Sequence, residues 1–142
     1  MTIYVDTSFL VSSCIQDAYS AEALRRMRLL PSVWITPLDR AELAHAISQY
    51  VFRGHLLPLE AQRAWSDFQQ DCGRGIWTLV SLPERIWETS IDLARKHGPT
   101  LGIRTLDSLH VASALELRAQ RFWTFDERQA KLAESVGLDT RA

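Results

Sequence analysis

The chain has 142 residues and a formal net charge of −1, with 46% hydrophobic and 23% charged residues. This length and composition predict one globular domain, residues 1–142, and exclude a disordered or fibrous protein. The near balance of 16 basic and 17 acidic residues excludes a protein that only coats nucleic acid, although it allows a nucleic-acid enzyme whose acidic site is screened by metal. No apolar run is long enough to cross a membrane and residues 1–20 lack a signal-peptide pattern, so we expect a cytoplasmic protein with no membrane partner.

The cysteine content argues against a zinc site. Cys14 and Cys72 are the only two cysteines, and their spacing matches no metal-binding pattern. Both fall in helical patterns, so we expect buried free thiols.

Short apolar strands alternate with helical patterns along the whole chain. In chain order, strands are expected at residues 3–5, 33–35, 76–82 and 121–125, with a short edge strand at 138–140. Helices are expected at residues 9–15, 18–30, 38–52, 59–72, 83–97, 105–119 and 126–136. This alternation predicts a three-layer α/β/α fold with a central parallel sheet of four to five short strands and about seven helices.

Local signals predict where helices begin and end and which faces they bury. Thr36 and Pro37 suit the N-cap and the first helical position, and Gly98-Pro99 is expected to stop a helix. The apolar stripe of the helix at 18–30 is formed by Ala21, Leu24, Met27 and Leu30. The stripe expected to face inward from the helix at 83–97 is formed by Ile86, Trp87, Ile91 and Ala94.

Residues 53–75 resemble the return arm of a helical hairpin. Trp65 and Phe68 lie on this arm, and the chain's five tryptophans are difficult to place in one small core. We therefore expect these two aromatic side chains to be partly exposed and to form a protein interface. The alternative is that the hairpin folds back and buries them.

Two acidic residues follow predicted strands directly. Asp6 comes after the first strand and Asp126 after the strand at 121–125. Because right-handed crossovers bring the carboxyl ends of parallel strands to one edge, both acids are expected at that edge. Each has a structural alternative as the N-cap of the next helix, and Asp126 with Gln129 resembles a capping box.

Two further acids fall in early turns of predicted helices. Asp107 lies in a first turn, where the helix dipole favours any carboxylate, and Glu42 lies in a second turn, where an isolated Glu is usually exposed. If all four acids converge, they need a counter-cation, because neighbouring carboxylates repel. A carboxylate set without a matching Cys or His set favours Mg²⁺, with Mn²⁺ as the alternative. The hydroxyls able to orient these acids belong to Thr7, Ser8 and Thr124.

The four acidic motifs resemble, in order and spacing, those of PIN-domain ribonucleases, and most of all VapC-type toxins of toxin–antitoxin pairs. The motifs are Asp6-Thr7-Ser8, Ala41-Glu42-Leu43, Thr105-Leu106-Asp107-Ser108-Leu109-His110 and Thr124-Phe125-Asp126. The resemblance runs from residue 3 to about residue 138. One departure is Phe125, which stands where such proteins commonly have a polar residue.

The resemblance implies a Mg²⁺-dependent endoribonuclease that inhibits translation or growth. The acids that carry over as catalytic and metal-binding residues are Asp6, Glu42, Asp107 and Asp126, with Ser8 and Thr124 as supporting polar residues. For His110, packing is favoured over catalysis. The implied partners are an RNA substrate, a cognate antitoxin and a second copy of the chain.

Two alternatives remain from the sequence. One is a PIN scaffold without catalytic activity that binds protein or RNA, against which the retention of four acids argues. The other is a phospho-aspartate phosphatase or receiver-like protein. The phosphatase needs a second Asp two residues after the first, where this chain has Ser8, and the receiver needs an Asp at the end of a middle strand, which residues 76–82 lack.

Overall fold

Four parallel strands form one sheet in the computed structural model, which describes residues 1–142. The strands are β1 (Thr2–Val5), β2 (Ser32–Ile35), β3 (Trp77–Leu79) and β4 (Arg121–Trp123), in the order β3-β2-β1-β4. Residues 138–140 do not add a fifth strand, because only one isolated bridge joins Asp139 to Arg121. The order makes β1 a central strand with β4 beside it.

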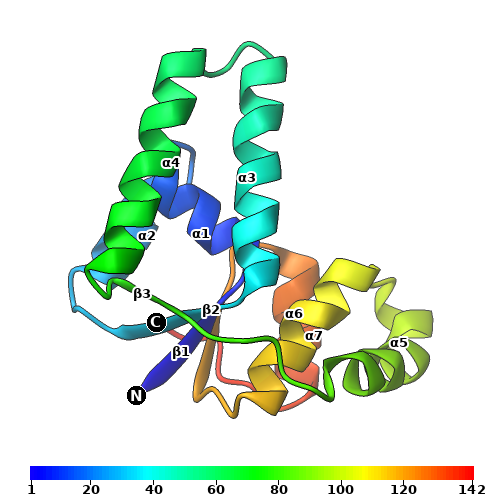
Figure 1. Cartoon of the computed structure of the whole chain (residues 1–142). Helices are drawn as coiled ribbons and strands as arrows, with labels where there is room; N and C mark the ends of the chain where they lie inside the picture. Colours follow the sequence, from blue (N-terminus) through cyan, green and yellow to red (C-terminus); the bar gives the residue numbers. More distant parts are fainter.

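Seven helices cover the two faces of the sheet. They are α1 (Thr7–Cys14), α2 (Ser20–Met27), α3 (Pro37–Phe52), α4 (Pro58–Gly73), α5 (Ile86–Leu101), α6 (Thr105–Glu116) and α7 (Glu127–Ser135). The first four pack together on one face, where α3 and α4 form an antiparallel pair, and α5, α6 and α7 pack together on the other (Figure 1). The three-layer α/β/α fold predicted from the alternating pattern is confirmed.

Alternation along β1 divides the core into two clusters. Ile3 and Val5 join the cluster beneath α1 to α4, and Tyr4 joins the cluster beneath α5 to α7. Successive side chains of a strand point to opposite faces, so a strand buried on both faces reads as a continuous apolar run. This explains why β1 carries no charged residue before Asp6.

The hairpin arm folds back onto the domain, and the prediction that Trp65 and Phe68 are exposed was wrong for Phe68. Phe68 is only 1% exposed and lies in the same core cluster as Leu43 of α3. Trp65 is partly buried against this cluster, and the guanidinium of Arg40 lies 5.4 Å from its ring centroid. The arm buries these rings because α4 packs against both α1 and α3.

The apolar stripe predicted for α2 was also wrong. Leu24 and Leu30 are 54% and 88% exposed, and Ala23 is the only residue of α2 that is buried. The helix ends at Met27, so Leu30 lies beyond it in a loop. Ala23 is the buried residue of this short helix, and of the predicted stripe only Met27 packs, partly buried, against the core cluster.

Helix α5 differs from its prediction in both phase and length. Trp87 and Ile91 are 59% and 50% exposed, whereas Ser90 is buried and its hydroxyl is hydrogen-bonded to that of Ser108 at 2.8 Å. The close approach of α6 therefore selects a face with a small polar residue. The helix also continues through Pro99, so the predicted stop at Gly98-Pro99 was wrong. Proline removes only one amide donor near the helix end, and Gly102, with a φ of 62°, ends α5 instead.

None of the seven helices combines the length and apolar character needed to span a membrane.

Candidate functional site

The candidate site lies in the crevice between the carboxyl ends of β1 and β4. The connections from these two neighbouring strands lead to opposite faces of the sheet, and ligands of open α/β folds bind at such a switch point. Asp6 follows β1 and Asp126 lies three residues after the end of β4. The amide N–H of Asp6 donates to the carbonyl oxygen of Trp123 at 3.2 Å, which extends the pairing of the strands to the edge of the crevice.

One cavity of about 260 Å³ in this crevice brings together all four acids named from the sequence. Asp6, Glu42, Asp107 and Asp126 line it. The remaining lining residues are Thr7, Ser8, Arg104, Leu106, His110 and Gln129. The two acids at strand ends and the two in early helix turns therefore share one space, as their positions in the predicted fold require.

Asp6 is both a helix cap and a wall of the cavity. Its Oδ1 accepts the amide N–H of Phe9 at 3.0 Å and the hydroxyl of Ser8 at 2.7 Å, and its Oδ2 accepts the hydroxyl of Thr124 at 2.6 Å. Burial raises the pKa of Asp6, while the charge of His110 and these hydrogen bonds oppose the rise. The two interpretations of Asp6 from the sequence are thus compatible.

Asp126 caps α7 but does not form the expected capping box. Its Oδ1 accepts the amide N–H of Gln129 at 2.9 Å, and its own amide donates to the hydroxyl of Thr124 at 2.9 Å. The Gln129 side chain turns away from this cap and donates to Oδ1 of Asp107 at 3.3 Å. Gln129 is therefore a site residue that the sequence analysis assigned only to a helix cap.

Arg104 is a cationic member of the cavity that the sequence analysis missed. Its amide donates to Oδ2 of Asp107 at 2.9 Å, its Nε lies 3.4 Å from the same oxygen, and its Nη2 lies 3.7 Å from Oδ2 of Asp126. The sequence feature that could have identified Arg104 is its position three residues before Asp107, because residues at this spacing are neighbours at the start of a helix. Asp107 raises the pKa of Arg104, first by the hydrogen bond and then by its charge.

Glu42 is half-buried and belongs to a hydrogen-bonded group of side chains. It therefore differs from an isolated Glu, which is usually exposed. Its Oε1 accepts the hydroxyl of Thr7 at 2.7 Å and contacts Nε2 of His110. Burial raises the pKa of Glu42, but the hydrogen bond and charge of His110 outweigh it and lower the pKa overall. His110 is buried as the packing interpretation requires, yet both ring nitrogens have polar partners, because Nδ1 lies 2.8 Å from the hydroxyl of Tyr4.

A buried carboxylate that the sequence analysis did not select, Asp39, lies behind this group. Its Oδ2 accepts the amide of Thr36 at 2.9 Å at the start of α3. Its Oδ1 lacks a hydrogen bond but lies 3.5 Å from Nδ1 of His110. Burial raises the pKa of Asp39 to about 7. Burial lowers the pKa of His110, but the facing carboxylates of Asp39 and Glu42 outweigh it and raise the pKa to about 9.

The chemistry of the cavity suits a hard divalent cation. Its donors are carboxylate and hydroxyl oxygens, which Mg²⁺ and Mn²⁺ prefer. As the side chains lie, no three of the His, Cys, Asp and Glu residues are close enough to surround an ion together. Mg²⁺ usually keeps several water ligands and uses only one or two carboxylates, so an ion in this cavity would need water to complete its coordination.

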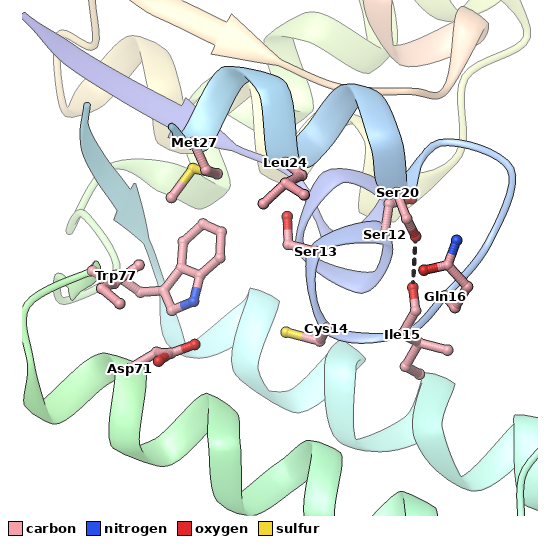
Figure 2. Close-up of a pocket in the computed structure, with 11 residues that line it drawn as sticks. Ser12, Ser13, Cys14, Ile15, Gln16, Ser20, Leu24, Met27, Asp71 and Trp77 are labelled. Atoms are coloured by element: carbon pink, nitrogen blue, oxygen red, sulfur yellow. Dashed lines mark hydrogen bonds between the residues drawn. The ribbon is translucent and has the colours of Figure 1, made fainter. Parts of the chain in front are cut away.

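A second cavity, of about 320 Å³, lies between α1, α2, α4 and β3, away from the acids (Figure 2). The indole of Trp77 and the side chains of Leu24 and Met27 point into it. Cys14 also lines it, but burial raises the pKa of this thiol to about 12, so the nucleophilic thiolate is absent near neutral pH. Cys14 and Cys72 are free and only partly buried. The acidic cavity is therefore the better candidate for a catalytic site.

Comparisons with known proteins agree with this architecture. A family model described as the PIN domain matches residues 3–135. None of the curated proteins matches the chain significantly.

Three solved structures share the fold. VapC20 of Mycobacterium tuberculosis, described as a sarcin-ricin loop cleaving toxin, is 18% identical with a TM-score of 0.68, over 96% of this chain and 95% of that chain. FitAcB from Neisseria gonorrhoeae is 14% identical with a TM-score of 0.67, and the match covers 99% of this chain and 96% of that chain. VapBC2 from Rickettsia felis, bound to a DNA fragment from their promoter, is 15% identical with a TM-score of 0.69, and the match covers 99% of this chain and 98% of that chain. At these identities the likeness establishes the fold.

The pKa of His110 leads to a prediction about stability. A group whose pKa is raised on folding, here from 6.5 to about 9, stabilises the protein below pH 6.5 and loses that contribution as the pH rises toward 9. The raised pKa of Asp39 acts in the same direction at lower pH. In EDTA, we expect the free energy of unfolding in urea to fall by roughly 1–2 kcal/mol between pH 6.5 and about pH 8.5. His110→Gln should remove the share of this fall that is due to the imidazole and leave only the smaller share due to Asp39, so a fall in the variant as large as in the parent would contradict the assignment.

Proposed function

Because the chain belongs to the PIN-domain family, we propose that it is a Mg²⁺-dependent endoribonuclease and the toxin of a toxin–antitoxin pair. The observation that carries the proposal is the convergence of Asp6, Glu42, Asp107 and Asp126 on one cavity at the switch point of the sheet. The proposed reaction is hydrolysis of an RNA phosphodiester, which leaves a 5′-phosphate and a 3′-hydroxyl. Such a protein acts in the cytoplasm.

Each part of the cavity has a role in this proposal. The four acids would hold a divalent ion directly or through its waters. Such an ion would supply a hydroxide near neutral pH and stabilise charge on the leaving oxygen, so no protein nucleophile would be needed. The hydroxyls of Ser8 and Thr124 orient Asp6, and the hydroxyl of Thr7 orients Glu42. Arg104, whose guanidinium lies beside Asp107 and Asp126 in the cavity, would be the cation that binds the scissile phosphate.

The alternative of a phosphatase or receiver-like protein has less support than the nuclease proposal. Ser8 stands where the phosphatase needs its second Asp, and no Asp lies at the end of β3, where the receiver needs one. The alternative of a PIN scaffold without catalytic activity requires the four acids to be retained without chemical use. Burying like charges together is costly, which favours a function that uses them.

Loss of one acid tests the nuclease proposal. We expect the purified protein with Mg²⁺ or Mn²⁺ to cleave RNA, EDTA to stop cleavage, and Asp6→Asn or Asp107→Asn to reduce the rate by about 100-fold. Asp92→Asn is the matched control, because Asp92 is exposed on α5 outside the cavity. Cleavage by Asp6→Asn at the parental rate would refute the proposed site.

The surface supports self-association through α5. Trp87 and Ile91, one turn apart, are 59% and 50% exposed, and exposed aromatic patches commonly form interfaces. We propose a homodimer that uses this face in place of the hairpin arm expected from the sequence.

Light scattering tests the dimer. Trp87→Ala with Ile91→Ala should weaken self-association by about ten-fold or more, because aromatic residues dominate interface energies. Leu59→Ala, at a position on α4 that is 66% exposed, is the control and should have no effect. A monomeric parent protein at micromolar concentration, or equal weakening by the control, would exclude this interface.

An antitoxin is the second proposed protein partner. A guanidinium of such a partner placed against Asp6 and Asp107 would replace the charge of the metal and inhibit the enzyme without a conformational change. A short, partly disordered DNA-binding protein encoded beside this gene is therefore expected to bind tightly and to stop cleavage. Replacement of the responsible Arg in the partner should restore cleavage, and a neighbouring protein that binds without inhibiting would count against the proposal.

A further inference from the structure

Asp126 lies at a junction where the acidic cavity meets two grooves. One groove, of about 490 Å³, contains Arg104, Arg128 and Lys131, and we call it the cationic groove. The other, of about 300 Å³, contains Tyr19 and Phe125, and we call it the aromatic groove. Asp126 borders all three hollows. A chain molecule that follows both grooves therefore passes Asp126, at the edge of the candidate catalytic cavity.

The cationic groove has an excess of positive charge, because its three cations stand beside only two acids, Asp126 and Glu127. Arg128 and Lys131 are three residues apart on α7, so they share a face, and both have solvent access. Neither forms a salt bridge, unlike Arg104, which faces Asp107 and Asp126. The overall charge of −1 means that attraction for phosphate must come from local groups of this kind.

The basic clusters most visible in the sequence do not supply that attraction at the site. Arg25 and Arg26 both bind Glu22 on α2. Arg95 and Lys96 lie on α5 and border neither the acidic cavity nor its two grooves. The cations of the cationic groove become a cluster only when α7 is brought beside Arg104.

The aromatic groove presents a ring held in place by two others. The Tyr19 side chain is 51% exposed, and its ring stacks on that of Phe125 with centroids 4.8 Å apart and planes at 10°. Phe125 in turn stacks on the buried ring of Phe9 at 5.2 Å. Two acids line this groove: Asp126 at the junction, and Asp17, whose oxygens accept hydrogen bonds from the hydroxyl of Ser12 and the amide of Tyr19.

We propose that a single RNA strand crosses the acidic cavity at Asp126, with a base stacked on Tyr19 and the phosphates beyond the scissile bond bound by Arg128 and Lys131. Unpaired bases stack on exposed aromatic rings irrespective of sequence, and phosphates bind lysine and arginine side chains. Phe125, which stands where the resembling proteins commonly have a polar residue, supports the tyrosine ring. The proposal rests on the proposed nuclease function and names the path of its substrate.

Salt dependence tests the proposed binding of phosphates. A fluorescent single-stranded RNA is titrated with protein carrying Asp6→Asn, which suppresses cleavage, in Mg²⁺ at several KCl concentrations. Removal of one phosphate-binding cation should reduce the slope of log affinity against log salt by about 0.7. Arg128→Ala with Lys131→Ala should therefore reduce the slope by about 1.4, whereas the control Arg95→Ala with Lys96→Ala, which removes the same charge, should leave it unchanged. If the two double variants reduce the slope equally, the proposed path of the RNA is wrong.

Aromatic substitution tests the stacked base. Tyr19→Leu, which keeps an apolar side chain but removes the ring, should weaken RNA binding by about five-fold or more, and Tyr19→Phe should retain binding. Equal weakening by both variants would overturn the stacking. Failure to bind RNA, together with binding of polyglutamate that depends on Arg128 and Lys131, would assign the groove to an acidic protein and overturn the path.

Failure of this path is distinguishable from failure of the nuclease proposal. If the parent protein cleaves RNA but the slope and Tyr19 tests show no effect, the path is wrong and the nuclease proposal stands. If the binding tests give the expected results but no divalent ion supports cleavage, the RNA path stands and the nuclease proposal fails.

Discussion

The four carboxylates that share one cavity repel one another, and much of the surrounding structure reduces this repulsion. Asp6 and Asp126 cap α1 and α7, and Asp107 lies in the first turn of α6. The positive end of each helix dipole therefore faces the cavity beside a carboxylate. In a parallel sheet with right-handed crossovers, helices begin where strands end, so the topology collects several helix N-termini at one edge. The fold itself thus makes an acidic site tolerable.

Side chains provide the rest of the compensation in two layers. At the mouth of the cavity, Arg104 faces Asp107 and Asp126. Beneath it, His110 lies between Glu42 and the buried Asp39, and it reaches Tyr4 on the sheet. The inner layer links the orientation of Glu42 to the core on the α5–α7 side, so the site and the stability of the fold are connected through one imidazole.

The surroundings of the cavity are asymmetric. The cationic groove lies on its α7 side, whereas the aromatic groove lies beside α1 and the loop before α2. Asp126 connects both to the acids, although its own hydrogen bonds only cap a helix. In the proposed path, Asp126 is therefore the residue that a polymer substrate passes as it enters the site. The exposed apolar residues Trp87 and Ile91 of α5 border neither groove, which leaves that face for a protein partner.

The sequence by itself determined the features that depend on neighbouring residues along the chain. Apolar strands followed at once by Asp6 or by Thr124 to Asp126 marked the edge of the sheet where the candidate site lies, because the order of strand, polar turn and helix is local and the crossover rule is general. Tertiary packing decided the rest. The inward face of α5 depends on the close approach of α6 at Ser108, and the burial of Phe68 depends on the packing of α4 against α1 and α3. Likewise, Asp39, Arg104 and Gln129 became part of the site only through partners on other turns or elements, because the sequence pattern does not encode where a side chain meets a distant one.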